Sequence, residues 1–285
     1  MKIGLVYPQI ELGGDPEAVR LIGCAAEELG YAHVLAYDHV LGAVHADREP
    51  PLMGPYTEAD PFHEPLTMFG YLAGLTERIG LATGVLILPQ RQTALVAKQA
   101  ADVDLYSGGR LRLGVGTGWN YVEYDALGQD FASRGRRQEE QIALLRELWT
   151  EPLVTFEGQH DQVDRANLLP RPGRRIPIWL GGFSEPAFRR GGKIGDGFIF
   201  AGRIDHALAG WERVQKHLAD AGRAEGDFGR DLVTLASRSI DELLPMIDSW
   251  EAAGGTHLSV CSMGMGLDTT DAHLELFHEV AKRVF

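Results

Sequence analysis

The sequence has little cysteine: its 285 residues include only Cys24 and Cys261. Both stand in apolar stretches that resemble a helix face and a strand, so we expect buried thiols and no disulfide. The chain also has no run of the roughly 18 to 20 apolar residues that a membrane-spanning helix needs. Its start, MKIGLVYPQI, does not resemble a secretory signal peptide. These absences favour a cytoplasmic protein.

Positive charge is also in short supply. Lys and Arg total 27 against 40 Asp and Glu, which gives a net charge of −13. Such a chain repels phosphate backbones and anionic lipid, so the composition argues against binding to nucleic acid or to a membrane surface. A bound phosphate group is still compatible with it, because backbone N–H groups at a helix start hold phosphate without net positive charge.

The sequence lacks a Gly-x-Gly-x-x-Gly motif after its first strand-like stretch, which an open dinucleotide-binding sheet needs. Short β-rich stretches instead alternate with longer stretches of helical period, as in βα units on a parallel sheet. Eight units favour a closed (β/α)8 TIM barrel, and we expect one such domain over residues 1–285. The expected strands are residues 2–7, 32–37, 79–88, 110–116, 176–180, 197–201, 232–235 and 256–261.

Helical stretches with one apolar face connect these strands. Asp15 and Pro16 are typical of a helix start, and Gly30 is typical of a helix end. In each stretch the apolar residues recur every three or four positions, so each helix has a face to pack on the barrel. These faces comprise Val19, Ile22, Ala26 and Leu29; Trp211, Val214 and Leu218; Leu244, Ile247 and Trp250; and Leu274, Phe277 and Ala281.

Two connections are longer than simple barrel loops. Residues 151–175 contain several Gly and Pro, and we interpret them as an insertion before the fifth strand. Residues 39–63 follow the second strand, on the side of a barrel where active sites lie. Their Pro, Gly and aromatic content suits a pocket wall or a lid over the barrel mouth.

Asp38 and His39 end the second strand, and an imidazole at that place can move a proton near neutral pH. The residues alone leave two other interpretations open. Asp38 can cap the loop while His39 is a packed or solvated histidine. Alternatively His33, His45 and His63 join His39 at a metal site, although no metal-ligand spacing supports this.

Glycines mark the ends of the third and fourth strands. Gly84 stands inside the third strand, where a glycine indicates a kink, a bulge or a close approach of another molecule. The fourth strand ends at Gly116 and is followed by Gly118, Trp119 and Asn120. The glycines leave space for a planar ring, and the indole and amide side chains can hydrogen-bond it. Glycine-rich βα loops are also ordinary turns, so both interpretations stay open here.

The fifth strand ends in Gly181, Gly182, Phe183 and Ser184, followed by Pro186. The two glycines free the backbone, and Ser184 with Pro186 resembles the cap and first turn of a helix. A helix start of this kind can bind an anion through its N–H groups. An ordinary capped helix without a ligand would have the same sequence.

Taken together and in order, these pieces resemble the luciferase-like monooxygenase family, in particular its branch that uses the deazaflavin coenzyme F420. The likeness runs over most of the chain. It rests on the Asp38-His39 pair, on TGVLILPQR, YSGGRLRLGVGTGW, GQHDQVDRANLLPRP and RIPIWLGG. The resemblance implies a TIM barrel that holds an isoalloxazine-like ring at its mouth, with the family's own insertion before the fifth strand.

The resemblance also implies roles for the candidate residues. Gly84-Val85 would form a non-proline cis peptide behind the ring. His39 would be the proton donor or the base that binds an alcohol, and Asp38 would orient it. Residues 116–120 would border the ring, and residues 181–184 would bind the phosphate-bearing tail of the cofactor. No metal takes part in this interpretation.

We therefore expect an F420-dependent oxidoreductase that transfers hydride to or from a small organic substrate, and a homodimer, as related proteins often are. Alternatives on the same fold are an FMN-dependent monooxygenase, a barrel that binds cofactor without turnover, and a metal-dependent hydrolase. One departure from the family pattern argues against a sugar phosphate as the substrate. The loops after strands seven and eight, including CSMGMGLDT, offer no basic clamp for a sugar phosphate, and Arg203 is the one cation nearby.

Overall fold

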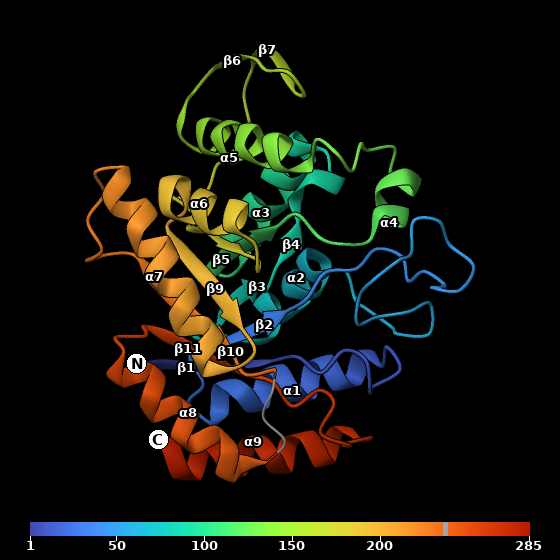
Figure 1. The fold of residues 1–285 in the computed structure, drawn as a ribbon, viewed down its shortest axis with the longest axis vertical. Coiled ribbons are helices and arrows are strands. Elements are labelled where there is room, and N and C mark those ends of the chain that lie inside the picture. Colours follow the sequence, from blue (N-terminus) through green and yellow to red (C-terminus); the bar gives the residue numbers. More distant parts are fainter. Residues whose placement is uncertain (236–238) are drawn as a thin grey trace.

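The computed structural model describes residues 1–235 and 239–285 and shows a closed parallel barrel surrounded by helices (Figure 1). This confirms the TIM barrel that the sequence predicts. Eight strand positions form the barrel, and the third is divided between two short strands. The strands are β1 (Lys2–Val6), β2 (His33–Ala36), β3 (Gly80–Thr83), β4 (Leu86–Ile87), β5 (Leu111–Gly116), β8 (Ile178–Gly181), β9 (Gly197–Ala201), β10 (Gly229–Val233) and β11 (His257–Val260).

Parallel pairing continues from β3 through β2, β1, β11, β10, β9 and β8 to β5. The barrel closes where Leu81 of β3 lies opposite Leu111 of β5. The third strand differs from the continuous stretch predicted at residues 79–88, because the chain is interrupted at Gly84-Val85 before β4 pairs with β5. That interruption is a cis peptide bond, as the resemblance implied.

The barrel is covered by helices whose apolar faces pack on the outward side chains of the strands, such as Leu5 and Val34. Asp15 caps the first helix by accepting a hydrogen bond from the Glu17 N–H at 2.9 Å, and Gly30 follows its end with φ of +88°. The helices are α1 (Pro16–Glu28), α2 (Pro65–Leu75), α3 (Thr93–Tyr106), α4 (Tyr121–Ala126), α5 (Arg134–Thr150), α6 (Glu185–Ile194), α7 (Ile204–Asp220), α8 (Ile240–Ala252) and α9 (Thr270–Val284), with a short 3-10 turn, η1 (Leu88–Gln90).

The seventh barrel strand begins earlier than the sequence predicts. The expected stretch is residues 232–235, whereas β10 spans Gly229–Val233. The polar residues Arg230 and Asp231 hide the start of the strand, because a buried parallel strand normally reads as an apolar run. Asp231 nevertheless faces the barrel interior and is fully buried.

Asp231 belongs to a polar layer inside the amino-terminal end of the barrel. Arg112 Nη2 donates to Asp231 Oδ2 at 2.5 Å, and Ser259 Oγ donates to Asp231 Oδ1 at 3.0 Å. Ser259 Oγ also lies 2.7 Å from His33 Nε2, and the Arg112 guanidinium lies 4.2 Å above the Trp179 ring. Burial raises the pKa of Asp231, but Arg112 and His33 outweigh that effect and hold it well below its ordinary value. Above this layer the interior is apolar.

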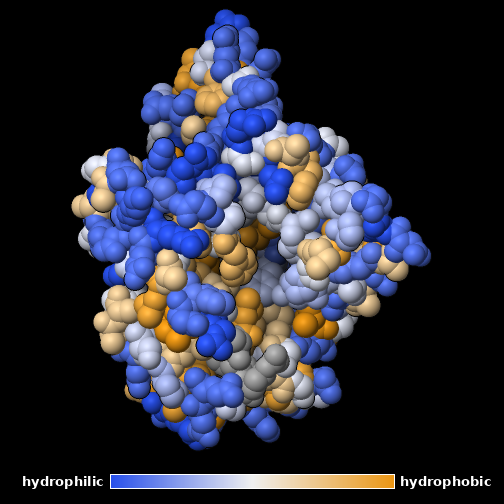
Figure 2. All heavy atoms as spheres, in the orientation of Figure 1, coloured by the Kyte–Doolittle hydropathy of each residue, from blue (hydrophilic) through white to orange (hydrophobic). Residues whose placement is uncertain are grey.

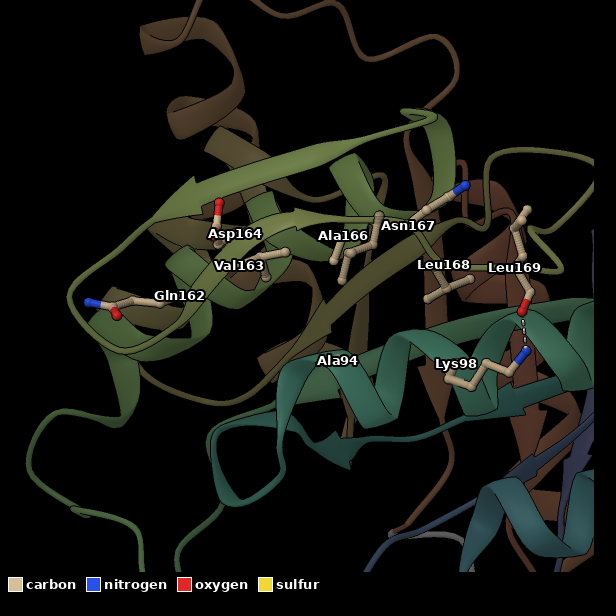
Figure 3. Close-up of a pocket in the computed structure, with 10 residues that line it drawn as sticks. Ala94, Lys98, Gln162, Val163, Asp164, Ala166, Asn167, Leu168 and Leu169 are labelled. Carbon is tan, nitrogen blue, oxygen red and sulfur yellow. Dashed lines mark hydrogen bonds between the residues drawn. The ribbon is translucent and has the colours of Figure 1, made fainter.

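The insertion before the fifth strand position forms an antiparallel hairpin, β6 (Val154–Glu157) and β7 (Gln162–Ala166), which the sequence analysis did not predict. The hairpin projects from the end of the molecule beyond α5 (Figure 1). Between it and α3 lies a cavity of about 480 Å³, where Lys98 Nζ donates to the Leu169 carbonyl at 2.8 Å (Figure 3). Glu140 holds the hairpin turn by accepting three backbone N–H groups, those of Gln159, His160 and Asp161.

None of the helices that the structure describes is long and apolar enough to cross a membrane. The two cysteines are both free: Cys261 is buried directly after β11, and Cys24 is half-buried on α1.

We predict that Asp231→Ala lowers the free energy of unfolding by about 3 to 5 kcal/mol, because it leaves the Arg112 charge buried without its partner. Urea unfolding followed by circular dichroism measures this change. Since the folded pKa of Asp231 lies below the unfolded value of about 3.9, the stabilisation is complete above that pH and is lost as the pH falls further.

Asp205→Ala is the matched control, since Asp205 forms an exposed ion pair with Arg203. Exposed pairs contribute at most about 1 kcal/mol. A loss for Asp231→Ala no larger than that of the control would contradict the structural role of the polar layer.

Candidate functional site

The candidate site lies at the carboxyl ends of the barrel strands, where the segment of residues 39–63 returns across the mouth. Figure 2 shows a hollow near the middle of one face, between α4 with the 39–63 segment on one side and α6 with α7 on the other, and apolar side chains are exposed around it. The side chains that the sequence singled out follow β2, β3, β5 and β8.

His39 is held by a buried carboxylate on α4. Its Nδ1 lies 3.2 Å from Glu123 Oε2, while Glu123 Oε1 accepts the backbone N–H groups of Val40 at 2.7 Å and Leu41 at 3.0 Å. Only 1% of the Glu123 side chain is exposed, against 10% of the His39 side chain. Burial raises the pKa of Glu123, but the hydrogen bonds from His39, Leu41 and Val40 outweigh burial and hold it below its ordinary value.

This geometry determines which nitrogen of His39 is free. An ionised Glu123 only accepts, so Nδ1 carries the proton that is donated to it. His39 Nε2 makes no hydrogen bond with any residue in the described part of the chain. The free Nε2 is therefore the atom that can accept or donate a proton at the mouth.

Asp38 does not orient His39, contrary to what the resemblance implied. Its two carboxylate oxygens accept from Arg91 Nη2 at 2.7 Å and from the Ile87 N–H at 2.8 Å. Burial raises the pKa of Asp38, and the Arg91 guanidinium opposes that shift. Asp38 thus ties the end of β2 to β4, while Arg91 is shared with Glu64 at the start of α2.

Aromatic rings surround the exposed side of His39. The ring centroids of Phe62, Tyr56 and Trp119 lie 4.8, 5.3 and 5.5 Å from the centroid of its imidazole. Trp119 packs directly on Gly54, where an added Cβ would come within 2.3 Å of the indole. Tyr56 and Phe62 of the 39–63 segment and Trp119 after β5 thus surround the imidazole with aromatic rings. That the segment forms a pocket wall or a lid stays a prediction.

Two of the predicted glycine positions, Gly116 and Gly181, meet at the Val85 side chain. A Cβ at Gly116 would lie 2.4 Å from Val85 Cγ2, and one at Gly181 would lie 2.7 Å from Val85 Cγ1. A Cβ at Gly84 would overlap Leu35, inside the barrel. Val85 is only half-buried, although it stands between β5 and β8. The cis peptide and the two strand ends therefore form one apolar floor that a flat ring can contact.

Asn120 and Gly118 border the site in a different way from that expected. Gly118 has φ of +63° and contacts Ile87, so it requires a glycine backbone. The Asn120 amide does not face a ligand: Oδ1 accepts from the Val122 N–H at 3.1 Å, and Nδ2 donates to the Leu41 carbonyl at 3.2 Å. Asn120 caps α4 and holds the 39–63 segment, so it acts on the site through the backbone.

The turn after β8 leaves a helix start open. Ser184 stands at the N-cap of α6, but its side chain makes no capping hydrogen bond. Gly182 has φ of +145°, which favours glycine, and Phe183 is 76% exposed and does not line the floor. Glu185, in the first turn, is hydrogen-bonded to His217 of α7. Pro186 has no N–H group, and the N–H groups of Ala187 and Phe188 donate to the Ser184 carbonyl at 2.9 and 3.1 Å. In the first turn only the Glu185 N–H is therefore left without a partner in the described chain, and binding of an anion at this turn stays a prediction.

The histidines do not assemble a metal site. His33 lies at the opposite end of the barrel in the polar layer, and His45 Nε2 lies 2.9 Å from the Tyr56 carbonyl oxygen. His63 packs beside the Tyr7 ring. Within residues 1–235 and 239–285, no three His, Cys, Asp or Glu side chains are grouped as metal ligands.

Arg203 is also engaged elsewhere than at the mouth. It is exposed, and its Nε donates to Asp205 Oδ1 at 3.1 Å on the first turn of α7. A role for Arg203 in holding a cofactor tail or a substrate is not supported by this contact.

A closed parallel barrel whose functional side chains gather at the carboxyl ends of its strands is the architecture of a TIM-barrel enzyme. A family profile described as luciferase-like monooxygenase matches residues 6–242, which is most of the chain. The chain belongs to the luciferase-like monooxygenase family, so it is an oxidoreductase, and the resemblance seen in the sequence is confirmed.

Relatives of this chain include an uncharacterized protein of Mycobacterium bovis, 31% identical over 76% of each chain. A pyrimidine monooxygenase, RutA, of Allorhizobium ampelinum is 34% identical over 63% of this chain and 51% of its own length. An F420-dependent glucose-6-phosphate dehydrogenase of Microbacterium testaceum is 31% identical over 74% of this chain and 61% of its own. The match thus spans only about half to three fifths of the two named enzymes.

Two solved structures share the fold over the whole of this chain. An F420-dependent secondary alcohol dehydrogenase in complex with an F420-acetone adduct has a TM-score of 0.81 at 16% identity and is covered to 99%. The oxygenating constituent of 3,6-diketocamphane monooxygenase from Pseudomonas putida, in complex with FMN, has a TM-score of 0.75 at 16% identity and is covered to 97%. At 16% identity, the likeness to these two structures shows that the fold is shared and nothing about function.

Sequence reasoning missed Glu123 and the aromatic wall. Asn120-x-x-Glu123 matches the capping-box pattern, which predicts a local helix start and not a contact with a residue 84 positions away. The aromatic residues Tyr56 and Phe62 were expected only as part of a long loop, since nothing in their spacing relates them to His39.

We predict that Glu123→Ala accelerates amide hydrogen exchange at Val40 and Leu41 by about ten-fold or more, because these N–H groups lose a charged acceptor contributing about 1.5 to 3 kcal/mol. Hydrogen exchange followed by NMR or mass spectrometry measures this.

Glu140→Ala is the control, because Glu140 also accepts backbone N–H groups from a turn. It should accelerate exchange at residues 159–161 and leave Val40 and Leu41 unchanged. Equal exchange at Val40 and Leu41 in wild type and Glu123→Ala would show that Glu123 does not anchor the segment.

Proposed function

We propose that this protein is an F420-dependent oxidoreductase that transfers hydride between the deazaflavin and a small organic substrate, with His39 handling the proton. The observation that carries the proposal is the Glu123–His39 pair, in which Glu123 engages Nδ1 and Nε2 has no partner in the described chain. Hydride transfer to a carbonyl group requires one proton at the oxygen, and a positioned histidine supplies it.

The residues of this chain provide the proton transfer and the positioning. Glu123 accepts from Nδ1, so His39 keeps Nε2 as its reactive nitrogen. The rings of Tyr56, Phe62 and Trp119 keep water from the imidazole. In an alcohol oxidation Nε2 accepts the hydroxyl proton, and in a carbonyl reduction it returns the proton. The deazaflavin, when bound, supplies the hydride or takes it up.

The residues at the mouth fit a cofactor with a flat ring and an anionic tail. Val85 presents an apolar surface between Gly116 and Gly181, and side chains at these two positions would collide with it. The start of α6 leaves the Glu185 N–H without a partner in the described chain, and this group can donate to a phosphate. We therefore assign Gly84, Val85, Gly116 and Gly181 to the ring, and Gly182 and Ser184 to the tail.

Both F420 and FMN are compatible with a floor of this kind. The F420-dependent relative and the proton-handling histidine support the deazaflavin. RutA and the FMN complex of the diketocamphane monooxygenase support the alternative, an FMN-dependent monooxygenase. The two cofactors are separable by experiment, since reduced flavin reacts with oxygen whereas the deazaflavin scarcely does.

The substrate that we propose carries no phosphate. Arg91 at the mouth is already paired with Asp38 and Glu64, and Arg203 is paired with Asp205 on α7. This differs from what the name of the glucose-6-phosphate dehydrogenase relatives says of their substrate. A neutral alcohol or carbonyl compound matches the aromatic wall around His39.

We predict that the protein, stripped of bound ligand, binds F420 with micromolar affinity and FMN at least about ten-fold more weakly. Parallel fluorescence titrations measure both affinities. His39→Ala should change the F420 affinity little but slow hydride transfer by about 10² to 10⁴-fold, the usual contribution of a general acid or base. The absorbance of F420 follows this rate with a panel of small alcohols and carbonyl compounds.

His278→Ala serves as the control, since His278 is exposed on α9 and contacts only the Leu274 carbonyl. It should leave both affinity and rate unchanged. Tight FMN binding together with oxygen consumption would move the assignment to the monooxygenase, and binding of neither cofactor would refute both functions.

The homodimer also remains a prediction of the sequence. Light scattering coupled to size-exclusion chromatography gives the mass in solution, and one chain has a mass of 31.2 kDa.

A further inference from the structure

A second cavity lies at the amino-terminal end of the barrel, away from the mouth. Its volume is about 180 Å³, and the first residues of β1, β2, β3, β5 and β11 surround it. The cavity has no part in the function proposed above. Its charged or titratable lining residues are Lys2, His33, Arg110, Arg112, Arg174 and His257.

All six of these side chains are basic, in a protein whose net charge is −13. Two of them are neutralised from outside the cavity lining: Arg112 pairs with Asp231 at 2.5 Å, and Arg174 pairs with Asp104 at 2.7 Å. Neither of the two carboxylates lines the cavity. The acidic surface of the protein is thus interrupted here by a basic hollow.

Two further cations have no carboxylate within ion-pair distance in the described chain. Lys2 is exposed at the rim, and Arg110 is half-buried. The Arg110 guanidinium donates to neutral acceptors only, including the Ile79 carbonyl at 2.6 Å and the Thr76 carbonyl at 2.7 Å. The charge of Lys2 and of Arg110 therefore remains as a positive excess around the cavity.

The lining also contains buried N–H groups that lack an acceptor. Arg112 Nη1 and Arg174 Nε are both inaccessible and make no hydrogen bond. Gly109 also lines the cavity. A Cβ atom added to Gly109 would lie 3.1 Å from Arg174 Nε. Buried donors of this kind normally have a partner, which these two atoms lack among the described groups of the protein.

The size of the cavity limits what that acceptor can be. At about 30 Å³ per water molecule, 180 Å³ holds about six waters. Sites for drug-sized ligands or cofactors start at about 300 Å³, so the cavity is too small for a flavin. A tetrahedral oxyanion with a few waters fits, and guanidinium groups bind such an anion through paired hydrogen bonds.

We propose that this cavity is a binding site for a small phosphate-type oxyanion, which Lys2 contacts at the rim while Arg110, Arg112 and Arg174 contribute positive charge around it. The anion joins the starts of five strands that otherwise meet through backbone pairing and through the polar layer. It would also lie against His33 and His257. Burial and the nearby Arg112 lower the pKa of His257 to about 3, so both rings report an added negative charge.

The test is an NMR titration of the histidine ring signals with sodium phosphate, against sodium chloride at equal ionic strength. We expect phosphate to shift the His33 and His257 signals saturably, and chloride to leave them in place. Lys2→Gln should weaken the phosphate affinity by about ten-fold, because the variant loses one hydrogen bond between charged groups. Lys216→Gln, a neutralised exposed lysine on α7, should not change it.

Phenyl phosphate distinguishes free phosphate from a phosphate ester. Weaker binding of the ester identifies a free oxyanion as the ligand, and equal binding identifies a site for the phosphate group of a small metabolite. The site is refuted if phosphate leaves both histidine signals unmoved, if chloride moves them equally, or if Lys2→Gln binds phosphate as tightly as wild type. A phosphate bound at the cofactor mouth is recognised separately, because it would be insensitive to Lys2→Gln.

Discussion

The candidate active site depends on one buried carboxylate. Glu123 comes from the helix after β5, yet it accepts hydrogen bonds from His39, Val40 and Leu41 at the end of β2. The side chains of Val40 and Leu41 are 41% and 47% exposed, so hydrophobic burial does not fix this part of the chain. The carboxylate does so, because an ionised group deprived of water needs all the donors that this turn offers. The orientation of the imidazole follows from the same contacts.

The barrel separates its two polar regions with an apolar middle. At the amino-terminal end, Arg112 and Asp231 form an ion pair inside the barrel. Removing one partner would leave the other charge buried and unpaired, so this layer contributes to the stability of the fold. At the carboxyl end the groups are arranged differently: Asp38 is neutralised by Arg91, while His39 keeps one nitrogen free. The strands between them carry Val6, Leu35 and other apolar residues.

The sequence predicted the barrel well because periodicity and helix caps are local signals. It predicted β10 poorly, since Asp231 is a charged residue within a buried strand, and its partner Arg112 is 119 positions away. The β6–β7 hairpin was missed because β6 is only four residues long and β7 is mostly exposed and polar. At the site, strand ends and glycines were recognisable. The link between His39 and Glu123 was not, since it depends on the closure of the barrel.

The floor of the site explains how one family can serve different cofactors and substrates. Val85 contacts the positions of Gly116 and Gly181, so the flat floor is determined by backbone geometry, which changes little when loops change. The walls come from the 39–63 segment, whose aromatic residues Tyr56 and Phe62 belong to no helix or strand. Substitutions in this wall can alter the substrate without disturbing the floor. The floor is thus built into the strands, whereas the surroundings of His39 are provided by the loops.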